Sequence, residues 1–199
     1  MNLAAEKIRY IPAIINLELT NICNFACIFC DYSILKKNMK AKTMEKSLLE
    51  KILQDLHGQR IYELSLVGLG EPLLDKDFSR HLELINNYSS PFRRILLNTN
   101  GAFLSKAIAE LICKSSINLI TFSLNATDRQ TYLKMMGQDQ FDHVIKNIIE
   151  FLKIRKAMDF LNCKVGIQYM SSPLNSRLKI KKIFEPFFAD GVTLFERAL

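Results

Sequence analysis

Three cysteines, Cys23, Cys27 and Cys30, lie within eight residues of one another. Thiolates at this spacing can ligate a metal ion, or can hold three corners of an iron–sulfur cluster, whose usual ligands are cysteines. The two other cysteines, Cys113 and Cys163, stand far along the chain among apolar neighbours. A four-iron cluster held by the triplet alone would therefore keep one iron open for a further ligand, as catalytic metal sites do.

A zinc site is the first alternative for these thiols. Zinc takes four ligands, and the histidine nearest in sequence, His57, follows a predicted helix. Cys113 or Cys163 could complete the set, but their apolar surroundings favour buried and inert thiols. The residues alone thus leave three interpretations: an open iron–sulfur cluster, a zinc site, or core cysteines without a ligand.

Composition narrows the class of protein. The 199 residues, 49% hydrophobic and 24% charged, suit one globular domain. The sequence has no apolar run of about 18 residues and no apolar signal-peptide region, so we expect a cytoplasmic protein without a membrane span. Such a chain uses clustered cysteines for metals more often than for disulfides. The net charge of +7 includes lysines at 36, 37, 40, 42 and 46, which we interpret as a solvated surface. No motif indicates nucleic-acid binding.

Strand and helix patterns alternate along the chain. Strands are predicted at 11–19, 62–67, 94–98, 119–123, 163–170 and 192–195. Helices are predicted from a Thr43 N-cap, over 77–87, from Ser105, after a Thr127 capping box, from Phe141, and over 177–188 with a break at Pro186. We expect the histidines, His81 among them, to be surface or capping residues beside helices. This order implies an α/β fold with a parallel sheet, either doubly wound or part of a barrel, with function at the carboxyl ends of its strands.

Polar motifs stand at those strand ends. They are Gly68-Leu69-Gly70-Glu71-Pro72, Thr99-Asn100-Gly101 and Ser123-Leu124-Asn125, with Gln168 on the fifth strand. Glycines let a backbone approach a ligand closely, a glutamate can accept hydrogen bonds from an ammonium group, and hydroxyl and amide groups suit a carboxylate or a ribose. Each motif by itself also fits an ordinary turn. Their common position predicts that they converge in space with the three cysteines.

The ordered set resembles the radical S-adenosylmethionine (radical SAM) superfamily. The resemblance rests on the C-x3-C-x-aromatic-C triplet, on Gly68 to Leu74 as a Gly-Gly-Glu-Pro turn with Leu69 in place of one glycine, and on the motifs at Thr99 and Ser123. It covers about residues 11 to 199 and implies a partial (β/α)6 TIM-like barrel that forms a radical SAM core domain over 1–199. The first ten residues would be an extension.

The resemblance also implies the cofactors and the chemistry. Cys23, Cys27 and Cys30 would bind a [4Fe–4S] cluster. S-adenosylmethionine would be bound by Phe29, Gly68, Gly70, Glu71, Thr99, Asn100, Ser123, Asn125 and Gln168. An external electron donor such as flavodoxin or ferredoxin would drive its cleavage to methionine and a 5′-deoxyadenosyl radical, which abstracts hydrogen from a substrate, a peptide or a small metabolite, that the sequence does not identify.

The motif style is closest to the SPASM-containing branch of the superfamily. Members of that branch carry a cysteine-rich C-terminal domain, which is missing from this sequence, so a further domain is one possibility and different substrate chemistry is the other. Two functions from other classes compete with the leading interpretation: an iron–sulfur electron carrier without catalysis, and a zinc-stabilised binding module.

Overall fold

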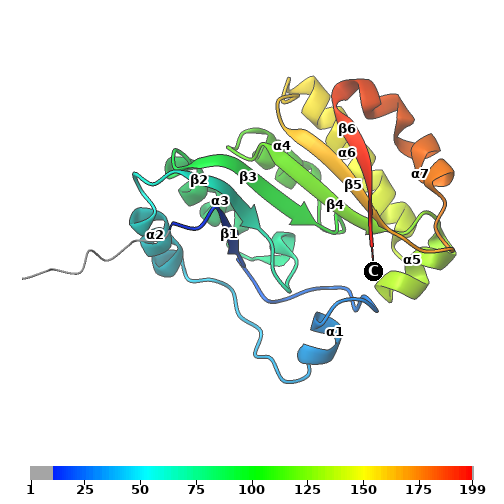
Figure 1. The fold of residues 1–199 in the computed structure, drawn as a ribbon, viewed down its shortest axis with the longest axis horizontal. Coiled ribbons are helices and arrows are strands. Elements are labelled where there is room, and N and C mark those ends of the chain that lie inside the picture. Colours follow the sequence, from blue (N-terminus) through cyan, green and yellow to red (C-terminus); the bar gives the residue numbers. More distant parts are fainter. Residues whose placement is uncertain (1–10, 199) are drawn as a thin grey trace, which may run out of the picture.

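The computed structural model describes residues 11–198, and the predicted N-terminal extension therefore lies outside the described residues. The described chain forms one sheet of six strands (Figure 1). They are β1 (Ile14–Leu17), β2 (Ile61–Leu66), β3 (Phe92–Thr99), β4 (Leu119–Asn125), β5 (Lys164–Met170) and β6 (Val192–Arg197). The helices are α1 (Tyr32–Leu35), α2 (Lys46–Asp55), α3 (Phe78–Asn87), α4 (Lys106–Cys113), α5 (Arg129–Met136), α6 (Phe141–Ala157) and α7 (Arg177–Phe184), with 3₁₀ turns at Pro72–Leu74 and Glu185–Asp190.

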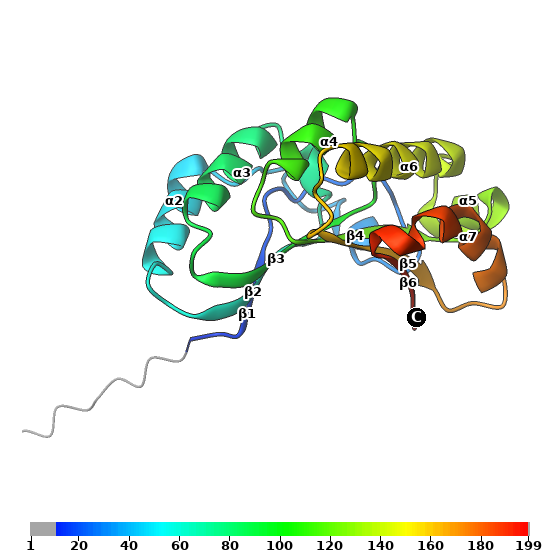
Figure 2. The ribbon, with the colours of Figure 1, turned by 90° about the horizontal axis from the view of Figure 1, so that it is seen from above.

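The strand order decides between the two expected architectures. All neighbouring strands are parallel, and the order is β1-β2-β3-β4-β5-β6 without a reversal. A doubly wound sheet reverses its order at a switch point, whereas a barrel is wound in one direction. The sheet is curved, and its larger helices lie along one face (Figure 2). The partial (β/α)6 barrel is therefore confirmed.

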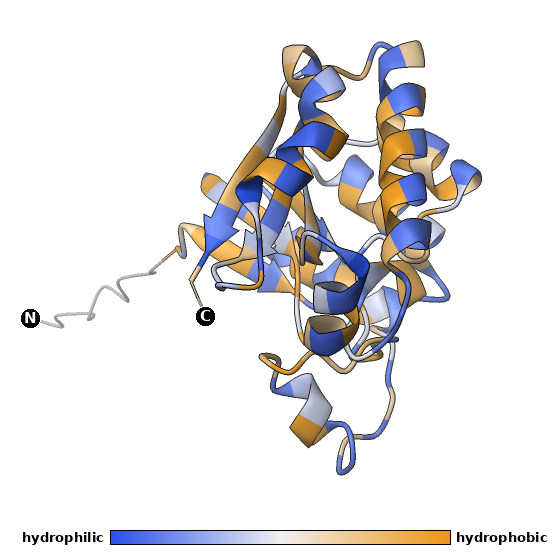
Figure 3. Ribbon diagram, turned by 90° about the vertical axis from the view of Figure 1, so that its right-hand side faces the viewer, coloured by the Kyte–Doolittle hydropathy of each residue, from blue (hydrophilic) through white to orange (hydrophobic). Residues whose placement is uncertain are grey.

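The hydrophobic core lies between the sheet and this layer of helices. On β3 the buried Ile95 and Leu97 alternate with less buried residues, because successive side chains of a strand point to opposite faces. Hydrophobic positions recur along the helices (Figure 3), and full burial of one such leucine or isoleucine contributes about 1.5–3 kcal/mol. Cys113 and Cys163 are buried in this core, as their surroundings predicted. The other face of the sheet is left for polar side chains such as Asn98 and Ser123.

Two helix starts differ from the prediction. Thr43 is not an N-cap, because it forms an isolated antiparallel bridge with Thr20, and α2 begins three residues later. At α5 the cap is Asp128, whose carboxylate accepts a hydrogen bond from the backbone N–H of Thr131. At α5 the neighbouring polar residue is thus the cap, whereas α2 begins after Glu45 without a side-chain cap.

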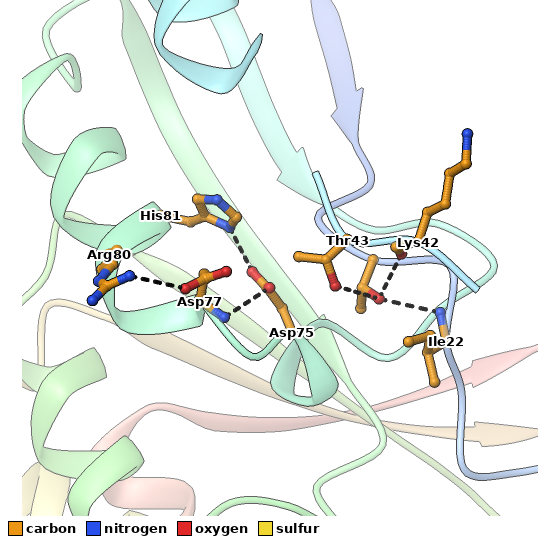
Figure 4. A network of polar contacts seen from close by, with 8 residues as sticks. Ile22, Lys42, Thr43, Asp75, Asp77, Arg80 and His81 are labelled. Atoms are coloured by element: carbon orange, nitrogen blue, oxygen red, sulfur yellow. Dashed lines mark hydrogen bonds and ion pairs between the residues drawn. The ribbon is translucent and has the colours of Figure 1, made fainter. Parts of the chain in front are cut away.

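His81 also differs from the prediction that it caps a helix or lies on the surface. Its side chain is 1% exposed, and Nδ1 lies 2.6 Å from the Asp75 carboxylate (Figure 4). The same carboxylate accepts a hydrogen bond from the Asp77 backbone N–H at 3.0 Å. The pair therefore fastens the turn after β2 to the first part of α3. The α7 prediction is confirmed, since the helix stops at Phe184 and Pro186 lies in a 3₁₀ turn.

No helix within residues 11–198 combines the length and the apolar character that crossing a bilayer requires.

Candidate active site

A cavity of about 430 Å³ opens at the carboxyl ends of the strands. The cysteine loop, which leads from β1 to α2, passes beside these strand ends (Figure 1). All of the site residues that the sequence predicted line this cavity except Gln168. Motifs that are up to about a hundred residues apart in sequence thus meet in one place, as the topology of a parallel sheet requires.

The cysteine loop is mounted on the end of α5. The backbone N–H groups of Ala26 and Ile28 donate to the carbonyls of Met136 and Met135, at 3.3 and 3.0 Å. These carbonyls are free for the loop because they belong to the last turn of a helix. Gly137 ends α5 at φ 77°, and a side chain there would also press on the carbonyl of Ala26. The position of the thiols is thus set by a helix that begins about a hundred residues later.

The buried aromatic ring of Phe25 packs against α5 and so anchors the cysteine loop. The ring is 2% exposed and meets the ring of Tyr132 edge-on, with 5.9 Å between centroids. The Tyr132 hydroxyl is buried and has no hydrogen-bond partner within the described residues. Burial raises the pKa of Tyr132, with the charges of Cys27 and Glu71 adding to the effect. The hydroxyl therefore stays protonated beside the thiols.

The three thiols are free, half-buried and electrostatically coupled. The pKa of Cys23 is raised to about 11, mainly by burial and also by the charges of Glu71 and Cys30, and that of Cys27 to about 12, mainly by burial and also by the charges of Cys23 and Cys30. Thiolates ligate metals, so these cysteines require positive charge at the site before they ionise together. The cations of an iron–sulfur cluster supply that charge, and the donor set therefore fits such a cluster.

The arrangement of the thiols bears on the choice between one shared metal ion and a cluster. Among residues 11–198 no group of three His, Cys, Asp or Glu side chains is arranged to hold a single metal ion. A cubic cluster takes each thiolate on a different iron, so its ligands surround a space rather than a point. The cavity next to Cys23, Cys27 and Cys30 is such a space.

Glu71 lines the cavity and is also held by donors of the protein. Its carboxylate is 3% exposed and accepts hydrogen bonds from the Thr99 hydroxyl at 2.6 Å, the Asn100 N–H at 2.7 Å and the Leu73 N–H at 3.1 Å. The carboxylate was expected to receive an ammonium group of the ligand, but most of its accepting capacity is used within the protein. Burial raises its pKa, which these hydrogen bonds partly counteract. Glu71 therefore fixes the end of β2 to the end of β3.

Gly68 and Gly70 are required by the packing of the chain on itself. A Cβ at position 70 would overlap the backbone carbonyl of Thr20, and one at position 68 would overlap the side chain of Glu18. The Glu18 carboxylate accepts hydrogen bonds from the N–H groups of Leu69 and Gly70, at 2.5 and 3.2 Å. The expected close approach thus takes place against the segment that follows β1, and the turn lines the cavity as a consequence.

The ends of β4 and β5 complete the wall. The Ser123 hydroxyl donates to Asn98 Oδ1 at 3.0 Å, and both residues line the cavity. Asn125 has φ 61° and follows an irregularity in the register with β5, which turns the chain at the strand end. Gln168 does not line the cavity as expected. It is buried behind the wall and donates to Asn125 Oδ1 at 3.1 Å, so it supports that side chain.

Sequence reasoning missed several residues of the cavity. Asn98 was counted only as a strand residue, although its alternation with Leu97 places it on the open face of the sheet. Arg197 was missed because the sixth strand was predicted to end at Phe195, two residues too early. Met136, whose sulfur lies 3.6 Å from Cys27 Sγ, belongs to a helix without a recognised motif. No signal in the sequence points to it.

Comparison with protein families gives one match that spans most of the chain. The model described as the radical SAM superfamily matches residues 17–165. A relative named probable GTP 3′,8-cyclase, from Saccharolobus islandicus, is 31% identical over 139 residues, which make up 67% of this chain and 42% of that protein. The chain thus spans less than half the length of the curated relatives it matches.

Solved structures show the same fold at low identity. Streptococcus suis SuiB, solved bound to S-adenosylmethionine, has a TM-score of 0.70 at 18% identity, covering 93% of this chain and 40% of SuiB. HydG, described as a maturase of the [FeFe]-hydrogenase, has a TM-score of 0.66 at 16% identity, covering 95% and 44%. In each case the shared fold accounts for less than half of the larger protein.

Proposed function

Because the chain belongs to the radical SAM superfamily, we propose that Cys23, Cys27 and Cys30 hold a [4Fe–4S] cluster beside a cavity that binds S-adenosylmethionine. The observation that supports this most directly is the convergence of the three thiols with the ends of β2, β3 and β4 around that one cavity. The finer assignment to the SPASM-containing branch stays a prediction, as do the limits of the domain and a cytoplasmic location.

Family membership establishes the class of protein and of chemistry. The chain is a radical SAM enzyme, and the cofactors of its superfamily are the [4Fe–4S] cluster and S-adenosylmethionine. Together these supply a 5′-deoxyadenosyl radical when an electron is delivered. We propose that the radical abstracts a hydrogen atom from a peptide or small-metabolite substrate.

Different residues of the chain would bind the cluster and S-adenosylmethionine. The thiols supply the cluster ligands, and the Phe29 backbone lies between the second and third of them. Ser123 and Asn98 present a hydroxyl and an amide to the cavity, which suit the carboxylate or the ribose of S-adenosylmethionine. Glu71 and Gln168 act one step away, since each hydrogen-bonds a residue of the wall. Their contribution is to keep the wall in place rather than to contact the ligand strongly.

Anaerobic reconstitution with iron and sulfide tests this proposal. The wild-type protein should be brown, hold about four iron atoms per chain, and convert S-adenosylmethionine to 5′-deoxyadenosine with dithionite. Cys27→Ala should lose the cluster, while the control Cys113→Ala, which removes a core thiol, should keep it. A colourless protein with tetrahedral zinc would contradict the proposal. A brown protein that forms no 5′-deoxyadenosine would favour an electron carrier instead.

A further inference from the structure

We propose that the outer side of the loop from Ile28 to Lys42 is the docking surface for a small acidic protein that carries single electrons. The surface consists of three exposed apolar residues and four lysines, and we refer to it as the lysine loop. Its residues are Ile28, Ile34, Leu35, Lys36, Lys37, Lys40 and Lys42. The inference rests on the proposed function, because it needs the cluster that Cys23, Cys27 and Cys30 would hold.

The first argument is the position of the loop relative to the thiols. Cys27, Phe29 and Cys30 line the cavity, whereas Ile28, between them in sequence, is 70% exposed. The cysteine segment therefore has an inner side that faces the cavity and an outer side that faces solvent. S-adenosylmethionine would fill the inner side. An electron that enters from solvent meets the outer side, at Ile28, without crossing the barrel.

The second argument is the charge of this outer side. Lys36, Lys37, Lys40 and Lys42 are all exposed, and Asp31 is the one acidic residue between Cys23 and Lys42. The lysines that form ion pairs within residues 11–198 are others: Lys51, Lys106, Lys156, Lys179 and Lys181. The four charges of the lysine loop are thus available to a partner. Such a patch attracts an acidic protein and raises its rate of encounter.

The third argument is that the lysine loop is held in place against the cysteines. Lys36 Nζ lies 5.9 Å from the centroid of the Tyr32 ring, and the Tyr32 hydroxyl accepts a hydrogen bond from the Cys23 N–H at 3.1 Å. At its base the loop is closed by the Thr20 hydroxyl, which donates to the Lys42 carbonyl at 3.0 Å. A surface that is ordered before binding loses less entropy on association.

The composition of the patch favours a redox protein over a nucleic acid. Ile34 is 72% exposed and Leu35 is also exposed, and both lie on α1 among the lysines. A small apolar centre inside a rim of one charge suits the compact interfaces of transient electron-transfer complexes. Recognition of single-stranded nucleic acid relies on free aromatic faces and arginines. The loop contains no arginine, and the ring of Tyr32 is already covered by Lys36.

The transfer itself balances simply. The reduced carrier loses one electron and the cluster gains it, while no covalent bond forms or breaks and no proton moves. The reductant is the carrier, and the same electron can be supplied without docking by dithionite. This difference separates the docking surface from the chemistry that follows.

The test compares two charge reversals of matched kind. One variant carries Lys36→Glu, Lys37→Glu and Lys40→Glu. The control also reverses three charges, with Lys146→Glu and Lys153→Glu on α6 and Lys182→Glu on α7, and all three of these lysines are exposed. The probe is an acidic flavodoxin. Its oxidised form is titrated against each protein by fluorescence anisotropy, and its reduced form is mixed with each loaded protein in an anaerobic stopped-flow instrument that follows cluster absorbance. A single-stranded RNA is titrated in parallel.

We expect the loop variant to lower both the affinity for flavodoxin and the rate constant of cluster reduction by about tenfold at low salt. The control should stay within about twofold, and added salt should slow the wild type more than the loop variant. Formation of 5′-deoxyadenosine with dithionite should be equal in all three proteins.

Three results would overturn the docking proposal. The first is wild-type affinity and reduction rate in the loop variant. The second is an equal loss in the control variant, which would assign the effect to net charge. The third is a loop variant that binds RNA more weakly than the wild type does but binds flavodoxin equally well. Absence of 5′-deoxyadenosine in the wild type with dithionite would instead contradict the proposed function, and the anisotropy titration would still decide on the docking surface.

Discussion

The Thr99 hydroxyl donates a hydrogen bond of 2.6 Å to the Glu71 carboxylate, and this bond joins the end of β3 to the turn after β2. The same carboxylate takes two backbone N–H groups, so three donors depend on one buried side chain. Glu71, which the sequence suggests as a ligand-binding group, therefore also stabilises the wall of the cavity.

Replacing Glu71 by alanine should lower the free energy of unfolding by about 3 kcal/mol, because three donors lose their acceptor and a cavity is left. Glu71→Gln keeps the shape and should cost less, about 1–2 kcal/mol at low pH. Urea unfolding of the cluster-free proteins measures both. Equal stability of Glu71→Ala and wild type would show that the carboxylate does not fasten the two strand ends.

The difference in stability between wild type and Glu71→Gln should change with pH in one direction. Burial raises the pKa of Glu71, so the folded state binds the proton more tightly than the unfolded state. Its contribution to stability is therefore complete below the unfolded pKa and is lost as the pH rises through the folded pKa. The stability difference between wild type and Glu71→Gln should narrow as the pH rises from 4 to 7, and a widening difference would contradict the shift.

Gly70→Ala should destabilise the protein by about 3 kcal/mol or more, because the new Cβ meets a backbone carbonyl that cannot turn away. The control is Gly58→Ala, where φ is +77° and nothing lies within 4 Å of the new Cβ. That change costs only the left-handed conformation, about 1–2 kcal/mol. Thermal and urea unfolding compare the two variants. If Gly70→Ala proved no worse than Gly58→Ala, the tight contact with Thr20 would not exist in solution.

The cluster-free protein should react slowly with iodoacetamide at Cys23 and Cys27. With a pKa of about 11 for Cys23 and about 12 for Cys27, the reactive thiolate is scarce at pH 8. The rate of labelling at each site, followed by peptide mass spectrometry, should rise about tenfold per pH unit from pH 8 to 10. A peptide of residues 21–32 serves as the control, because its rates should level off near pH 9. The same levelling in the folded protein would contradict the effect of burial.

Tyr132→Phe should stabilise the cluster-free protein by about 1 kcal/mol, because it removes a buried hydroxyl that has no partner in residues 11–198. The matched control is Tyr88→Phe, whose hydroxyl accepts a bond of 3.3 Å from Gln54 at the surface, and which should change stability by less than about 0.5 kcal/mol. A loss of stability in Tyr132→Phe would indicate that a buried water satisfies the hydroxyl.

Strand periodicity was enough to predict a parallel α/β sheet and the meeting of the motifs, whereas the choice of a partial barrel over a doubly wound sheet came from the family resemblance. Alternation of strands and helices gave a parallel sheet, and a parallel sheet places all strand ends at one edge, so Cys23, Glu71 and Ser123 had to converge. Membership in a family then explained why they converge. These predictions depend on topology, which short-range patterns determine well.

The roles of individual side chains depended on contacts that local patterns do not encode. The ligand contact expected of Glu71 stays a prediction, but its hydrogen bonds to Thr99 and Asn100, at the end of another strand, were not foreseen. Gln168 was expected in the cavity because its strand position was read without the twist and irregularity beside Asn125. His81 was expected at the surface because nothing in the sequence pairs it with Asp75. Each error arose where a hydrogen bond between distant segments decided the outcome.

The contact between the cysteine loop and α5 has a consequence for the synthesis of the protein. Cys27 and Met136 are separated by 109 positions, so the thiols leave the ribosome long before the helix that positions them. At ordinary speeds of translation this interval is about 5 to 20 s. During that time the triplet is an unstructured group of thiols, open to oxidants and to the wrong metal. Assembly of the proposed cluster at the position that α5 sets would therefore follow the folding of the first four strands.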